Sequence, residues 1–164
     1  MINWQKIGAI VAAAAGAAIV AGTSFAGTTA ATKVYPFTGT YAGNATALVQ
    51  DTVASLTANG TGKATLLGAG KITGIGSATA KEPCAPFLGT GTITGKGGTL
   101  LFKVINGSQG CGDEEGNVFS LSGSILVTKG TGKFAKAKGT LRMTGMFDRG
   151  AGKFSVKFTG KLAV

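Results

Sequence analysis

The sequence has no histidine, and its 164 residues include only two cysteines, three prolines and one tryptophan. Without histidine the chain lacks the usual base of nucleophilic triads and the commonest protein ligand of transition metals. These absences exclude His-based catalysis and most metal sites. The sequence therefore favours a binding or structural role over an enzymatic one.

Acidic residues are also scarce, with six Asp and Glu against sixteen Lys and Arg, for a net charge of +10. Such an excess favours association with polyanions through the summed field of many charges. No aromatic and basic recognition motif accompanies the charge, so nucleic acid is not an expected partner. Anionic envelope polymers and anionic lipid are the nearest alternatives for an exported protein.

The only run of acids is Asp113-Glu114-Glu115. Carboxylate oxygens suit a hard cation, but three adjacent acids in a Gly-rich loop match no calcium-loop spacing, and a solvated loop explains them equally well. The Gly-rich segments precede no predicted helix, so no phosphate-cradling loop is expected. We expect neither a metal nor a cofactor.

Residues 1–26 have the features of a secretory signal peptide that is cleaved after Ala26. Lys6 is followed by an apolar run over residues 7–20, and small residues occupy the cleavage positions at 24–26. A retained membrane anchor is the alternative, but the run is shorter than the ~20 residues of a membrane span, and no lipid-accepting cysteine follows it. Cleavage also fits after Ala21, Ala30 or Ala31. Residues 27–164 are then one secreted or extracytoplasmic domain without a membrane span.

Cys84 and Cys111 are the only cysteines. In an exported chain, two cysteines most often form a disulfide. A metal-binding or redox pair is the alternative, but neither residue belongs to a CxxC motif, and two thiolates alone make a poor metal site. The sequence therefore predicts a Cys84–Cys111 disulfide.

Beyond the N-terminal segment, no stretch shows sustained helical periodicity, and Gly, Thr, Val, Ile and Leu dominate. This composition predicts an all-β fold. The expected strands are Lys33–Tyr41, Thr46–Thr57, Lys63–Thr79, Phe87–Gly95, Thr99–Asn106, Asn117–Thr128, Lys133–Phe147 and Lys153–Ala163. The breaks between them are short, so we expect an eight-stranded antiparallel up-and-down β-barrel. We expect it to be monomeric, because closure of the barrel removes exposed strand edges.

The final hairpin shows the clearest alternation: Phe154, Val156 and Phe158 alternate with lysines and small polar residues. If Phe147 pairs with Gly152, like charges face each other on the outer surface, Arg142 opposite Lys157 and Lys138 opposite Lys161. The basic outer face comprises Lys138, Arg142, Lys153, Lys157 and Lys161. It is either a solvated face that protects the sheet from edge pairing or a surface for an anionic partner.

In a meander, successive connections alternate between the two ends of the barrel, so Cys84 and Cys111 should meet at one rim. The same rim should hold Glu82, Asp113, Glu114, Glu115 and Asp148, with Asp51 the only acid elsewhere. The opposite rim should hold the turns at 60–63 and 130–133, together with Lys96 and Lys129. The predicted molecule is therefore electrically polarised.

Two kinds of residue are candidates for binding a ligand. Asp51 is the acid expected within a strand; if its side chain points inward it is a candidate general acid or base, and otherwise it faces solvent. Phe119, Phe147 and Phe154 belong to a set of phenylalanines that either line a cavity or simply fill the core.

The segment Gly130-Thr131-Gly132-Lys133-Phe134, followed by Ala137 and Gly139, resembles the GTGxFxxAxG signature of allene oxide cyclase and dirigent-like barrels. The sequence pattern over residues 62–68 is similar to that of related, uncharacterised secreted bacterial barrel domains. The resemblance implies a calycin-like, eight-stranded barrel with an apolar interior, in a family that cyclises lipid epoxides or steers phenoxy-radical coupling. Lys129 and Lys136 depart from the signature, and no catalytic residue of the family has a match.

Three hypotheses follow. The first is a secreted, monomeric barrel that binds a small apolar molecule, and it requires an internal cavity of a few hundred Å³ open at the disulfide rim. The second is an envelope-associated module that binds anionic polymer through the basic outer face. The third is a cyclase-like or dirigent-like enzyme, which requires a polar group inside the barrel.

Overall fold

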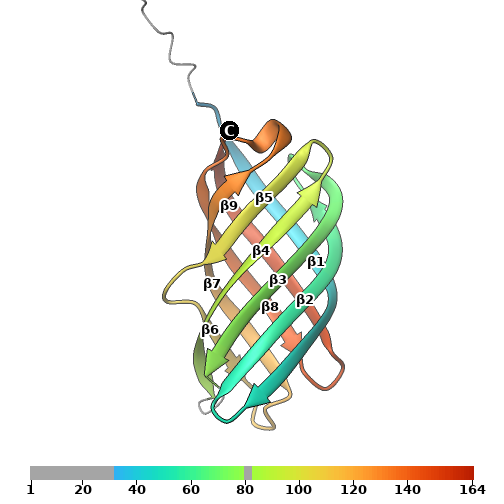
Figure 1. The fold of residues 1–164 in the computed structure, drawn as a ribbon, viewed down its shortest axis with the longest axis vertical. Helices are drawn as coiled ribbons and strands as arrows, with labels where there is room; N and C mark the ends of the chain where they lie inside the picture. The colour runs from blue at the N-terminus through green and yellow to red at the C-terminus, as the bar shows by residue number, and fades with distance from the viewer. Residues whose placement is uncertain (1–31, 80–82) are drawn as a thin grey trace, which may run out of the picture. The chain divides into compact units, whose positions relative to one another are not determined.

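The computed structural model describes residues 32–79 and 83–164 as a closed antiparallel β-barrel (Figure 1). Its strands are β1 (Val34–Gln50), β2 (Val53–Ala64), β3 (Gly68–Thr79), β4 (Cys84–Gly95), β5 (Gly98–Val104), β6 (Gln109–Gly112), β7 (Val118–Gly130), β8 (Gly139–Asp148) and β9 (Lys153–Ala163). β9 closes the barrel by pairing with β1, and β5 and β6 share one place between β4 and β7.

The predicted all-β, eight-stranded antiparallel barrel is therefore confirmed, and its architecture is consistent with a calycin-like fold. The predicted signal peptide, residues 1–26, lies outside the described residues, and the domain limits 27–164 stay a prediction. Among the residues that the structure describes, no helix is long and apolar enough to cross a membrane.

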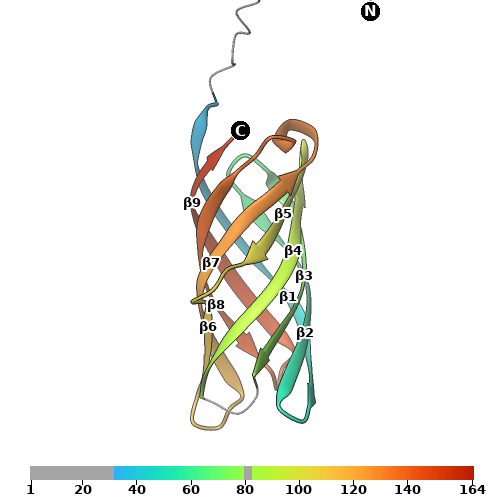
Figure 2. The same cartoon turned by 60° about the vertical axis from the view of Figure 1, so that its left-hand side comes forward.

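A bend at residues 105–108 separates β5 from β6 (Figure 2), and β6 itself lies where the sequence predicted a loop, between the expected strands Thr99–Asn106 and Asn117–Thr128. Ser108 holds this bend: it is buried, its Oγ donates to the Ile105 carbonyl at 2.9 Å, and the Ser124 N–H donates to the same Oγ at 3.1 Å. Gly123 makes room for it, since a Cβ there would lie 2.1 Å from the Ser108 Oγ. β5 and β6 are thus two short strands that together occupy one strand position of the barrel.

The predicted breaks at 42–45 and 58–62 are wrong, because both lie inside the β1–β2 ladder, where Gly43 pairs with Gly60. Glycine serves close packing there, as a Cβ on Gly60 would lie 2.9 Å from the Phe154 ring. The actual turns lie at 51–52 and 65–67, within predicted strands. Asp51 is therefore in a turn and not mid-strand.

The predicted register of the β8–β9 hairpin is wrong by two residues: Phe147 pairs with Phe154. The Ala151 N–H donates to the Asp148 Oδ1 at 2.7 Å, and Gly152 adopts φ 64°, so the turn lies one residue later at each end. Arg142 faces Thr159, Lys157 faces Thr144, and Lys138 faces Ala163. No like charges stand directly opposite one another in this hairpin.

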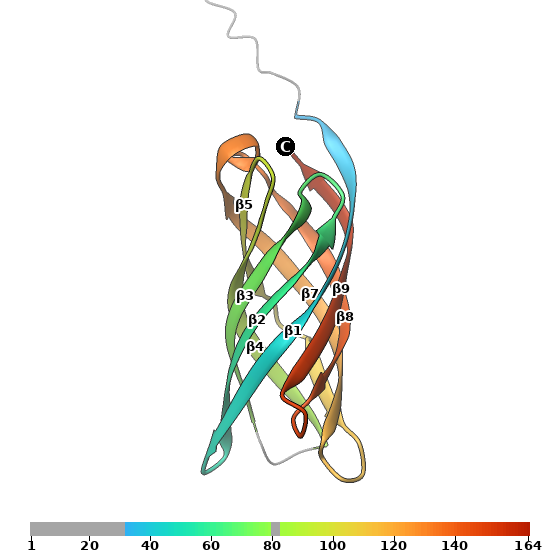
Figure 3. The same cartoon turned by 90° about the vertical axis from the view of Figure 1, so that its right-hand side faces the viewer.

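The predicted disulfide is confirmed: Cys84 and Cys111 are bonded, with their Cα atoms 3.9 Å apart. They are cross-strand partners at the ends of β4 and β6, and not loop residues. We call this the disulfide end. It also holds the connections at 51–52, 113–117 and 149–152, which lie together at one end of the barrel in Figure 3.

The opposite end is closed by side chains from its connections. Leu67, in the β2–β3 turn, is fully buried, and so are Phe134 and Ala137 from the β7–β8 connection, which includes a short 3₁₀ helix (Gly132–Phe134). The core beneath them is tightly packed, and each such apolar side chain contributes about 1.5 to 3 kcal/mol on burial. This packed half includes Phe37, Tyr41, Ile93, Leu100, Ile125, Leu141, Phe158 and Leu162.

Candidate functional site

The barrel is hollow in the half nearer the disulfide, where a cavity of about 230 Å³ occupies the interior. The cavity exists because inward positions in this half carry side chains too small to meet across an eight-stranded barrel. The small lining residues are Ala45, Ala47, Ala54, Ala58, Gly74, Gly76, Ala78, Ala85 and Gly89. Around the Gly76–Gly89 pair of β3 and β4 the wall is little more than backbone, with Ile75 and Leu88 on its outer side.

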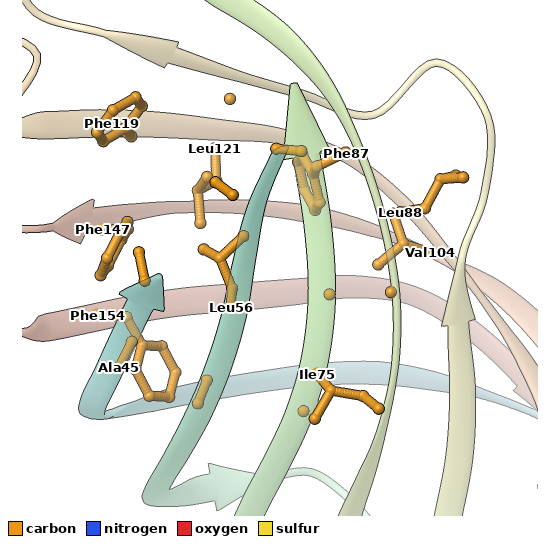
Figure 4. A pocket seen from close by; sticks show the side chains of 18 of the residues that line it. Ala45, Leu56, Ile75, Phe87, Leu88, Val104, Phe119, Leu121, Phe147 and Phe154 are labelled. Carbon is orange, nitrogen blue, oxygen red and sulfur yellow. The ribbon is translucent and has the colours of Figure 1, made fainter. Parts of the chain in front are cut away.

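Larger apolar side chains complete the wall. Figure 4 shows Leu56, Leu121 and Phe154, from β2, β7 and β9, projecting into the same space. Phe87 and Val104 contribute from β4 and β5. Val49 faces inward at the end of β1 yet is 49% exposed, so the cavity opens to solvent at the disulfide end.

The lining is almost wholly carbon. Among the described residues, no carboxylate or free thiol lines the cavity, and Arg149 at the mouth is the only charged side chain that does. Thr79 and Thr90 also border it, but they occupy outward positions, opposite Val53 and Ile75. The arrangement can exclude water and bind an apolar molecule, and it presents no acid or base to one.

Of the four candidate ligand-binding residues, the structure brings three together. Phe119, Phe147 and Phe154 line the cavity, and the rings of Phe119 and Phe147 stack with centroids 6.1 Å apart. Asp51 lies apart from them: it is exposed in the β1–β2 turn, with φ 52°, and does not line the cavity. Of the two alternatives for Asp51, the structure shows the one in which it faces solvent.

Phe102 and Phe158 form the floor of the cavity, with ring centroids 5.9 Å apart. Tyr41 packs beyond Phe158 and is only 1% exposed. Its hydroxyl has no hydrogen-bond partner within the described part of the chain. Burial disfavours the tyrosinate anion and raises the pKa of Tyr41 from 10.0 to about 12.

Tyr41→Phe is expected to raise the free energy of unfolding at neutral pH by about 1 kcal/mol, because it removes a buried hydroxyl without a partner. Since the pKa of Tyr41 is about 12 in the folded state and 10.0 when unfolded, ionisation favours unfolding above pH 10. Between pH 10 and about pH 12, the free energy of unfolding of wild type should fall by about 1.4 kcal/mol per pH unit relative to that of the variant. Denaturant unfolding of both proteins at neutral and alkaline pH measures this. A variant less stable than wild type at neutral pH would show that the hydroxyl is satisfied.

The five predicted surface cations point outward on β8 and β9 or just before them, but they do not form one patch. Lys138 and Lys161 lie near the closed end, and Arg142 and Lys157 lie along the middle. Lys153 lies at the disulfide end, where its Nζ donates to the Asn44 Oδ1 at 2.6 Å. The face is basic along its whole length.

The acidic run folds as a self-bonded loop. The Asp113 carboxylate accepts the backbone N–H groups of Asn117 and Val118, at 2.8 and 3.2 Å, and Glu115 accepts the Asn117 amide at 3.4 Å. Within residues 32–79 and 83–164, no group of three or more His, Cys, Asp or Glu side chains is placed to hold a metal ion.

Comparison with protein-family models, with curated proteins and with solved structures finds no match for this chain. The cavity must therefore be interpreted from its own geometry. Sequence reasoning missed its small-residue wall, although a signal exists: Ala45, Ala47, Gly74 and Gly76 follow the two-residue period of inward positions. Such alternation marks where a barrel lacks side-chain volume.

Proposed function

We propose that this protein binds a small, uncharged, apolar molecule in the open half of its barrel. The observation that carries the proposal is the cavity of about 230 Å³, lined by carbon and open at the disulfide end. Its volume lies between the roughly 150 Å³ of an apolar cavity that takes up benzene and the ~300 Å³ at which drug-sized sites begin. A ligand of one to three rings, or a short branched chain, fits these limits.

The charges at the mouth favour a neutral ligand. Five carboxylates, Asp51, Asp113, Glu114, Glu115 and Asp148, surround the opening, against two described cations, Arg149 and Lys153. Their net negative field opposes the entry of an anionic head group. Inside the mouth, no polar side chain of the described residues would compensate a buried charge.

The two alternative functions have less support. Binding of an anionic polymer through the β8–β9 face would use cations that are spread along the whole barrel. A cyclase-like or dirigent-like activity would need a polar group in the cavity, and kinship with those barrels remains a prediction from residues 130–139. We also propose an extracytoplasmic location, for which the disulfide is the support.

Titration with the neutral fluorophore N-phenyl-1-naphthylamine tests the proposed function. We expect saturable binding of one probe per barrel, with a rise in fluorescence because the probe leaves water for an apolar site. Affinity should change by less than about twofold between 0.1 and 1 M salt, since no charge pairing is involved. Absence of saturable binding would contradict the proposal.

A further inference from the structure

The structure separates charge between the two ends of the barrel more completely than the sequence predicted. Asp51, expected elsewhere, joins Asp113, Glu114, Glu115 and Asp148 at the disulfide end, while Glu82 lies outside the described residues. The opposite end, which Leu67, Phe134 and Ala137 close, carries eight exposed lysines and, among the described residues, no Asp or Glu side chain. These are Lys33, Lys63, Lys96, Lys129, Lys133, Lys136, Lys138 and Lys161. We call this the basic end.

The lysines of the basic end come from several separate elements. Lys96 lies in the β4–β5 turn, Lys133 and Lys136 lie in the β7–β8 connection, and the others lie at or beside strand ends. The Lys133 N–H donates to the Gly97 carbonyl at 2.8 Å, which holds two of these connections together. The fold thus gathers onto one end charges that are far apart in the sequence.

Exposed apolar side chains lie among these lysines. Val34 is 60% exposed and Tyr35 is 37% exposed at the start of β1, and Leu66 is 41% exposed in the β2–β3 turn. This turn lies against β1, because the Thr38 N–H donates to the Thr65 Oγ1 at 2.9 Å. The basic end therefore presents aliphatic and aromatic groups to solvent together with its cations.

Leu66 is held in the left-handed region, with φ 70°. Glycine or asparagine would adopt this conformation with less strain, and a leucine there costs about 1 kcal/mol or more. The strain leaves 41% of this apolar residue exposed, so the folded chain gains only part of the stabilisation that full burial of a leucine gives. A strained, exposed leucine on a basic surface points to a partner that the isolated protein lacks.

We propose that the basic end docks on an anionic membrane surface. The lysines supply the electrostatic attraction, and Leu66, Val34 and Tyr35 enter the headgroup region, where aromatic and aliphatic groups are stabilised beside cations. An anionic polysaccharide would use the lysines but not the apolar groups, which is why the membrane is favoured. Because the mouth lies at the opposite end, docking leaves the ligand cavity facing away from the bilayer and accessible.

Co-sedimentation with vesicles tests this inference. The vesicles contain phosphatidylcholine, either alone or with about 30% phosphatidylglycerol, at about 0.1 M salt. The variants are a basic-end triple (K96E, K133E, K136E), a mid-barrel triple that reverses the same number of charges (K103E, R142E, K157E), and Leu66→Asn. All share one N-terminal segment, so differences between them report on the barrel. Cooperative thermal unfolding, which does not depend on ligand binding, checks that each variant is folded.

Wild type should bind only the anionic vesicles, and the basic-end triple should bind them at least about tenfold more weakly. The mid-barrel triple should lose less than about threefold. Leu66→Asn should weaken vesicle binding while raising thermal stability, because it relieves strain and removes the inserting group. If the two triple variants lost the same affinity for anionic vesicles, binding would depend on net charge alone, and the proposal would be overturned. Unchanged vesicle binding by Leu66→Asn would overturn it in favour of a purely polyanion-binding surface.

Discussion

Gly62→Ala is expected to lower the free energy of unfolding by about 3 kcal/mol or more, the upper range for overpacking a close-packed core. Gly62 faces inward on β2 in the packed half of the barrel. A Cβ there would lie 2.0 Å from the Thr40 carbonyl oxygen and 2.6 Å from the Tyr41 ring. Both obstacles are rigid, because one is ladder backbone and the other is a fully buried ring. Urea unfolding of the variant measures the loss.

Gly74→Ala is the matched control, since Gly74 also faces inward but lies in the wall of the cavity. A Cβ there meets only the Thr90 carbonyl oxygen, at 3.4 Å. This substitution should be neutral or stabilise the fold by up to about 1 kcal/mol, because alanine loses less conformational entropy on folding. Similar losses for Gly62→Ala and Gly74→Ala would contradict the division into packed and hollow halves.

Removal of the disulfide by the double substitution Cys84→Ala and Cys111→Ala is expected to cost about 3 to 4 kcal/mol in the chain-entropy model. The bond closes a loop with a sequence separation of 27 residues. It also lies where the barrel wall is weakest, since β4 and β6 are joined through only three residue pairs. Thermal unfolding of the variant and of wild type measures the effect.

Reduction provides the control for the disulfide. Wild type treated with a thiol reductant should unfold at the lower temperature of the double variant, and the variant itself should not respond. A loss below about 1 kcal/mol would mean that the β4–β6 pairing holds without the covalent bond.

The fold class was predictable because period-two alternation, the absence of helical periodicity and short turns all agree in this chain. The disulfide was predicted from two cysteines in an exported chain, and the count of connections served only to place both of them at one rim. Cys84 and Cys111 lie at the same end because Cys84 begins β4, the chain reverses once between β4 and β5, and Cys111 lies near the end of β6, which continues in the direction of β5.

The first three strands were mispredicted because glycine has two uses in a small barrel. Asn44 and Gly60 looked like turn residues, yet Gly60 makes room for the Phe154 ring, and Asn44 binds Lys153 across the β1–β9 pair. The real β2–β3 turn contains Leu66 in a left-handed conformation, which leucine does not signal. Close packing and strain depend on partners that are distant in sequence.

The candidate site was predictable in part for a similar reason. The alternation of apolar residues indicated that Phe119, Phe147 and Phe154 face inward, but whether their rings enclose space depends on the residues opposite. Those residues are alanines and glycines of β1 to β4, whose small volume matters only after the barrel closes. Asp51 was misplaced because its strand was extended through the actual turn.

The titration of N-phenyl-1-naphthylamine into Ala47→Phe and Thr46→Phe tests the central claim most directly. Ala47 faces the cavity, whereas Thr46, its neighbour in β1, is exposed on the outer face. The added ring in Ala47→Phe should therefore lower the affinity for the probe at least about tenfold, which corresponds to about 1.4 kcal/mol of binding free energy. The same ring in Thr46→Phe should leave the affinity unchanged. Equal affinity of the two variants for the probe would show that the cavity is not the binding site.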